Sequence, residues 1–72
     1  MFPNEVAILT AIKENGGLGL QQLTHVTDIS GSCLRYVCNA MCLYGYLERK
    51  NPKEYRATRK GEKAIFEAIL GN

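Results

Sequence analysis

The 72-residue sequence predicts a mainly α-helical domain that carries one small β-hairpin. Four stretches repeat apolar residues with the three- and four-residue spacing that places side chains on one face of a helix. Between the third and the fourth stretch, two short alternating segments flank the turn-forming pair Asn51-Pro52. We therefore expect the order helix, short strand, helix, turn, helix, two strands and helix.

The first helix is expected to begin near Asn4, whose side chain can accept a hydrogen bond from an unpaired backbone N–H. Glu5 follows at the positive end of the helix dipole. The inward-facing stripe comprises Val6, Leu9 and Ile12, and Ile8 widens it. The stretch Asn15-Gly16-Gly17 should end the helix, because glycine tolerates the left-handed cap conformation.

The second helix is expected to be short. Leu18-Gly19-Leu20 can form only a bridge-like strand, and a helix over residues 21–26 then buries Leu23 and Val26. Asp28-Ile29-Ser30 is typical of a tight turn, since Asp and Ser side chains compete for backbone hydrogen bonds, and Ile29 can enter the core.

The third helix is expected over residues 31–44, with Ser30 as its N-cap and Gly45 at its end. Its apolar residues recur at i, i+3, i+4 and i+7, and they are Leu34, Val37, Cys38 and Met41. This spacing predicts a helix with one buried face and one polar, exposed face.

Residues 46–50 and 55–57 are expected to form a hairpin, in which Tyr46 and Tyr55 close the core. Thr58 should cap a last helix, and Gly61 permits another element to approach that helix closely. The buried stripe of the last helix is expected to consist of Ala64, Ile65, Ala68 and Ile69.

Length and composition predict one domain over residues 1–72, because so short a chain encloses only a modest core. The chain is 46% hydrophobic and 22% charged, which is sufficient apolar content for folding. It has neither an apolar run approaching the roughly 20 residues that cross a bilayer nor a secretory leader pattern. We expect a cytoplasmic protein without a membrane partner.

Three cysteines, Cys33, Cys38 and Cys42, lie within ten residues, and an odd, clustered set predicts reduced thiols rather than a disulfide framework. Zinc binding, with His25 as a further ligand, is a weaker alternative, because no C-x₂-C pair exists and Cys33 lies well round the helix from the other two. We expect core filling, no metal and no cofactor, with Cys42 partly exposed.

Catalysis is also a weak interpretation. His25, Asp28 and a nearby serine, Ser30 or Ser32, supply the residue types of a nucleophilic triad, but a short turn offers neither a pocket nor an oxyanion hole. The sequence has no phosphate-binding loop or paired catalytic carboxylates. We therefore expect a protein that is not an enzyme, with His25 on a helix surface.

The net charge of +2 conceals an asymmetry. Residues 1–34 hold one lysine against three acidic residues, a charge of −2. Residues 49–63 hold seven lysines and arginines against Glu54 and Glu62, a charge of +5. The hairpin and the start of the last helix therefore form a basic patch.

The element order is that of a winged helix-turn-helix, and residues 8–58 resemble the N-terminal DNA-binding domain of IclR-type bacterial regulators and, more loosely, MarR-type repressors. The stretches that carry this resemblance are Gly17-Leu18-Gly19-Leu20-Gln21-Gln22-Leu23, residues 30–41, and Gly45-Tyr46-Leu47-Glu48-Arg49 with Tyr55-Arg56. The sequence departs from the IclR-type pattern in lacking its small-molecule ligand domain, in two extra cysteines, and in Gly31.

The resemblance implies a sequence-specific protein that binds double-stranded DNA, a small transcriptional regulator associated with the nucleoid when bound. The helix at residues 31–44 would enter the major groove, where arginine pairs with guanine and asparagine with adenine. Four residues correspond to the outward-facing positions of the recognition helix in such families, and they are Ser32, Arg35, Tyr36 and Asn39. The wing at residues 49–56 would lie on the phosphate backbone. The expected phosphate contacts are Arg49, Lys50, Lys53, Arg56, Arg59 and Lys60.

Alternative interpretations remain. Both polar faces are also compatible with ordinary solvated surfaces, and winged helices also serve as protein–protein interaction adaptors that do not bind DNA. We expect a homodimer, because Ile8, Phe66 and Leu70 extend the apolar faces of the first and last helices beyond one small core.

Overall fold

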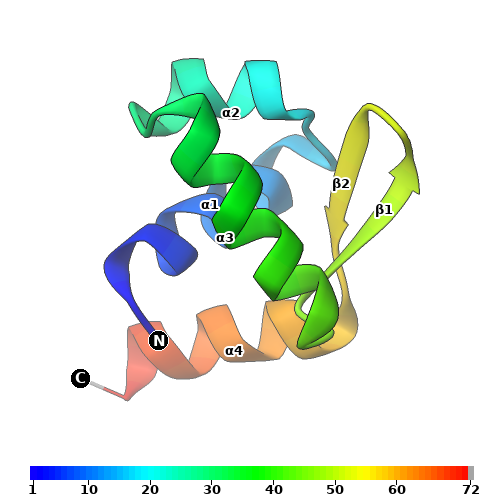
Figure 1. Cartoon of the computed structure of the whole chain (residues 1–72). Helices are drawn as coiled ribbons and strands as arrows, with labels where there is room; N and C mark the ends of the chain where they lie inside the picture. The colour runs from blue at the N-terminus through cyan, green and yellow to red at the C-terminus, as the bar shows by residue number, and fades with distance from the viewer. Residues whose placement is uncertain (72) are drawn as a thin grey trace.

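The computed structural model describes residues 1–71. Its elements are α1 (Pro3–Asn15), α2 (Leu20–Thr27), α3 (Gly31–Leu43), β1 (Leu47–Asn51), β2 (Glu54–Ala57) and α4 (Arg59–Leu70). The predicted winged helix-turn-helix order is confirmed. In Figure 1, α3 crosses in front of α1, α2 lies at one end, the hairpin stands to one side, and α4 closes the base. No helix within residues 1–71 is long and apolar enough to span a membrane.

The core draws side chains from every helix and both strands, and no polar or charged residue among the described ones is buried in it. Burial of each large aliphatic side chain contributes about 1.5 to 3 kcal/mol. The buried residues are Ile8, Leu9, Ile12, Leu18, Leu23, Leu34, Cys38, Met41, Leu47, Tyr55 and Ile65. The stripe predicted for α3 is thus confirmed, with Val37 half-buried at its edge.

The sheet is an antiparallel hairpin in which Arg49 pairs with Tyr55 and Leu47 with Ala57. Leu18 joins it as an isolated bridge: its N–H donates to the carbonyl oxygen of Tyr55 at 3.1 Å, and the N–H of Tyr55 donates back at 2.8 Å. The predicted bridge-like strand is confirmed. It ties β2, near the tip of the wing, to the loop before α2.

Two of the predicted N-caps are confirmed. The Ser30 hydroxyl accepts from the N–H of Cys33 at 3.4 Å, and the Thr58 hydroxyl accepts from the N–H of Gly61 at 3.0 Å. The predicted cap of α1 is wrong, because the helix begins at Pro3 with Phe2 in the cap position. Proline fixes the helical φ at the first position, and Glu5 accepts the N–H of Phe2 at 2.9 Å.

Three burial predictions are also wrong. Val26 is 56% exposed, whereas Leu20 and Ile29, on either side of it in the sequence, pack against the core together with the buried Leu23. Ile69 is 65% exposed, since the last turn of α4 extends past Ile65, the last fully buried residue of that helix.

Ile8 is fully buried, which agrees with its place in the inward stripe but contradicts the expectation that it extends the apolar face of the first helix beyond the core. The reason is that α1 contacts α2, α4 and β2, so adjacent residues of this helix both reach the core. Val6, the first residue of the predicted stripe, is half-buried at the rim.

Candidate nucleic-acid interface

The exposed face of α3 carries all four predicted base-contacting side chains, Ser32, Arg35, Tyr36 and Asn39. Their spacing of three and four residues places them in one stripe, opposite the buried residues Leu34 and Met41. The Ser30 cap begins the helix just before this stripe. The structure therefore brings the four side chains together on one surface.

A groove of about 830 Å³ runs between the start of α2, the middle of α3 and the wing. Its walls include Arg35 and Asn39 from α3, and Arg49 and Lys53 from the wing. Gln21, which sequence reasoning did not single out, lines the groove from α2. No carboxylate lines it, so three cationic side chains make this surface electropositive.

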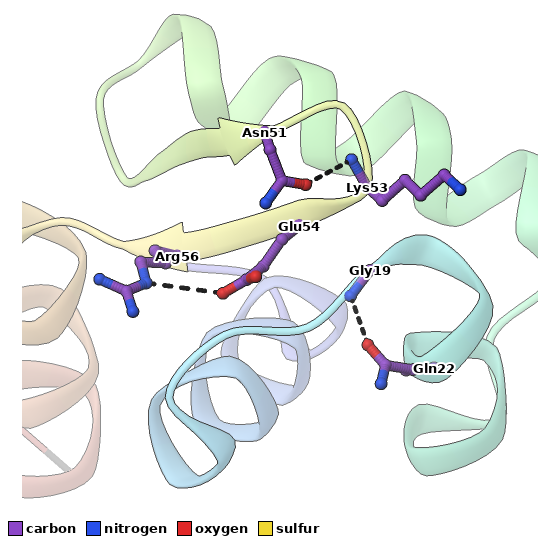
Figure 2. Close-up of polar contacts among 6 residues, drawn as sticks. All are labelled: Gly19, Gln22, Asn51, Lys53, Glu54 and Arg56. Atoms are coloured by element: carbon purple, nitrogen blue, oxygen red, sulfur yellow. Dashed lines mark hydrogen bonds and ion pairs between the residues drawn. The ribbon is translucent and has the colours of Figure 1, made fainter.

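The wing tip lies directly against the loop that precedes α2, as Figure 2 shows. A methyl group at Gly19 would overlap the backbone carbonyl of Lys53, so the close approach requires glycine there. The N–H of Gly19 donates to the Gln22 side chain at 2.9 Å, which caps α2. At the tip, Asn51 accepts from the N–H of Lys53 at 2.9 Å and tightens the turn. The wing is therefore held in a defined position beside α2.

The predicted phosphate-contacting residues fall into two sets. Arg56 lies 3.6 Å from the Glu54 carboxylate, and Arg49 donates to the Tyr55 hydroxyl at 2.7 Å. Lys60 donates to the carbonyl oxygen of Tyr44 at 2.6 Å, just beyond the last residue of α3, and its ammonium group sits over the Tyr46 ring. These three side chains already contact other parts of the domain.

The second set has free cationic groups. Within residues 1–71, the side chains of Lys50, Lys53 and Arg59 make no ion pair or hydrogen bond, and all three are exposed. Arg35 on α3 is equally unpaired among the described residues. These groups can meet an anion without breaking an internal contact.

Leu43 is the other surface residue that the sequence reasoning missed. It is 87% exposed and lies four residues after Asn39, at the end of the same stripe. An apolar side chain in that position can contact the methyl group of thymine. The signal was available, because Leu43 continues the i, i+4 spacing of the polar stripe.

Of the three cysteines, Cys38 belongs to the core and Cys42 packs against it, whereas the expected core filling does not extend to Cys33. Cys38 is buried, and Cys33 and Cys42 are half-buried. Burial, with a smaller contribution from neighbouring Cys42 and against the opposing charge of Arg49, raises the pKa of Cys38 to about 12. Burial likewise raises the pKa of Cys42, again with Arg49 opposing. Raised pKa values keep both thiols protonated and poorly nucleophilic at neutral pH.

Comparison with known proteins gives one informative match. No protein-family model matches the chain, and the search of curated proteins finds no significant match. The chain is similar to the crystal structure of transcriptional regulator Tm0710 from Thermotoga maritima, with a TM-score of 0.84 and 26% identity. The match covers 94% of this chain and 51% of the other, so the chain spans about half the length of that regulator.

This match supports the winged helix-turn-helix fold. It does not show an IclR-type protein, whereas the looser likeness to MarR-type repressors fits it. The similar protein is a transcriptional regulator.

Proposed function

We propose that this chain is a sequence-specific protein that binds double-stranded DNA and regulates transcription, with α3 in the major groove and the wing on the phosphate backbone. The observation that carries the proposal is the groove in which Arg35 and Asn39 of α3 face Arg49 and Lys53 of the wing. A reading helix beside a cationic wing matches what duplex DNA presents, namely base edges flanked by phosphates. The similarity to a transcriptional regulator supports the same conclusion.

In this proposal the protein acts in the cytoplasm, on the nucleoid when bound. Its base contacts come from Ser32, Arg35, Tyr36 and Asn39, and it needs neither a cofactor nor a metal. Lys50, Lys53 and Arg59 supply the main phosphate contacts, because their charged groups are unpaired in the described part of the chain. Arg49, Arg56 and Lys60 contribute less, because each would have to leave an internal partner.

A salt titration tests whether only the basic residues with unpaired charges bind phosphates, or whether those with internal partners do so as well. Each phosphate contact adds about −0.9 to the slope of log affinity against log salt, so the homodimer proposed below should give about −5.4 with three contacts per subunit and about −10.8 with six. We expect the smaller magnitude, measured by fluorescence anisotropy with a labelled duplex. A slope near the larger value would show that Arg49, Arg56 and Lys60 also bind phosphates. No duplex binding at low salt would reject the proposal in favour of a protein-interaction adaptor.

Base reading and phosphate binding are expected to separate between α3 and the wing. Arg35→Ala should reduce discrimination at one base position by about 1 to 3 kcal/mol, whereas Lys53→Ala should weaken all sequences alike and reduce the salt slope by about 1 per subunit. Selection of bound sequences from random duplexes, followed by affinity measurements, checks both effects. If Arg35→Ala weakens specific and random DNA equally, Arg35 does not read a base.

We further propose that the protein binds DNA as a homodimer. Phe66, Ile69 and Leu70 of α4 remain exposed in the single chain. A groove of about 580 Å³ between the start of α1 and the end of α4 lies beside them. A second copy would cover this apolar surface, and two-fold symmetry would extend a footprint that is short for one domain. Ile8 plays no part, since it is buried.

Sedimentation velocity at tens of micromolar is expected to show a dimer. Phe66→Asp should give a monomer by placing a charge in the apolar contact, and Lys63→Asp, an exposed change on the same helix, should leave the dimer intact. A wild-type protein that sediments only as a monomer would contradict the homodimer.

A further inference from the structure

We infer that Arg49 determines the base preference of α3 by engaging the amide oxygen of Asn39, so that Asn39 selects guanine instead of adenine. This inference rests on the proposed function. It gives Arg49 a role different from the phosphate contact that its place in the basic hairpin suggested: a positioning residue for the reading helix.

Arg49 is held in place by the core. Its Nη2 atom donates to the Tyr55 hydroxyl at 2.7 Å, and its guanidinium carbon lies 5.0 Å from the centre of the Tyr55 ring. Tyr55 is itself 3% exposed and pairs through its backbone with Leu18. The guanidinium therefore stands on a fixed support at the edge of the groove.

From this support Arg49 reaches the reading helix. The same Nη2 atom lies 3.5 Å from Oδ1 of Asn39, at the outer limit of a hydrogen bond. A guanidinium group only donates hydrogen bonds, so the amide of Asn39 must turn its oxygen toward Arg49 and its Nδ2 group away. The contact thereby fixes which end of the amide is available to DNA.

This orientation changes the chemistry of base recognition. Asparagine pairs with adenine by accepting from N6 and donating to N7, which requires its amide oxygen and its Nδ2 group to face the base edge together. In this site the oxygen is turned toward Arg49, and the adjacent positive charge repels the amino hydrogens of adenine N6. Guanine presents only acceptors, O6 and N7, on its major-groove edge. The donors of Nδ2, with the guanidinium charge behind them, favour that edge.

The chain offers a matched control for charge. Lys50 follows Arg49 on β1, is exposed, and makes no side-chain contact with Asn39 among the described residues. Arg49→Met and Lys50→Met each remove one positive charge from the wing, but only the first frees the amide of Asn39. Tyr55→Phe is a second variant: it keeps the charge and the ring and removes the hydroxyl that positions Arg49.

The experiment is selection of bound sequences from random duplexes with the wild type and each variant, followed by competition measurements on single-base substitutions. Asn39→Ala identifies the position that Asn39 reads. At that position we expect the wild type to prefer guanine over adenine by about tenfold. Arg49→Met should reverse the preference for guanine, and Tyr55→Phe should reduce it. Lys50→Met should weaken binding to all sequences and leave the preference for guanine unchanged.

Several results would overturn the inference while leaving the DNA-binding proposal in place. They are an adenine preference in the wild type, an unchanged preference in folded Arg49→Met and Tyr55→Phe, and no base position that depends on Asn39. Failure of the wild type to bind any duplex would reject the proposed function itself. Circular dichroism of each variant establishes that it is folded.

Discussion

Replacing Gly61 with alanine is expected to lower the free energy of unfolding by about 2 to 3 kcal/mol, a large part of the ~5 kcal/mol typical of so small a domain. A methyl group at this position would overlap the carbonyl oxygen of Tyr46 and lie 3.1 Å from the side chain of Leu9. The carbonyl cannot easily move, because it accepts from the N–H of Thr58 at 3.1 Å, and the Thr58 hydroxyl, which lies 2.5 Å from the Gly45 carbonyl oxygen, also lies within 3.1 Å of it. Backbone strain at this contact outweighs the gain of about 1 kcal/mol in helix propensity.

Gly31→Ala is the matched control for this substitution. Gly31 is also a helical glycine, but a methyl group there would have its nearest neighbour at 3.9 Å, an ordinary contact with Thr24. We expect its stability to stay equal to that of the wild type or to rise slightly. Urea unfolding followed by circular dichroism measures both variants. Equal changes in the two would show that the contact between α4 and Tyr46 does not constrain position 61.

The stability of the domain is expected to fall at alkaline pH because of Cys38. The pKa of this thiol rises from 9.0 to about 12 on folding, so between these values the unfolded chain loses a proton that the folded chain keeps. The native state then binds more protons than the unfolded state, and its stability decreases as pH rises. Below pH 9 both states are protonated and the effect vanishes. The expected loss is roughly 1 kcal/mol per pH unit within this window.

Cys38→Ala isolates this effect from the titration of tyrosines and lysines. The variant should be less stable than the wild type at neutral pH, because it leaves a small cavity in the core. From pH 9 upward the difference between the two proteins should shrink, since only the wild type carries the buried thiol. Urea unfolding at intervals from pH 7 to pH 11 checks this. A difference that stays constant across that range would mean that the thiol does not couple to folding.

The element order, most caps and most of the core could be predicted from the sequence, because they follow from local rules. The three- and four-residue apolar spacing predicted α3, and a serine or threonine directly before an apolar helical pattern predicted the N-caps Ser30 and Thr58. Burial at Ile8, Val26 and Ile69 could not be predicted. The burial of these side chains depends on how many elements pack against each helix and on where the core ends. The spacing of apolar residues along a single helix specifies neither.

The candidate site shows the same division. That Arg35 and Asn39 share one stripe follows from helical geometry, and the structure places both in the groove. That Lys60 lies against Tyr44 and Arg49 against Tyr55 could not be foreseen, because these contacts join residues from different elements. A cluster of basic residues in the sequence therefore does not reveal which of the charges already have partners within the domain.

The pairing of Leu18 with Tyr55 has a consequence for the thermodynamics of binding. These two hydrogen bonds hold β2 of the wing before any ligand arrives, so the conformational entropy of ordering the wing is lost during folding and not during association. A substitution that loosens the bridge would therefore weaken affinity without removing a single contact with DNA. Calorimetry would register it as a more unfavourable entropy of binding, at an enthalpy close to that of the wild type.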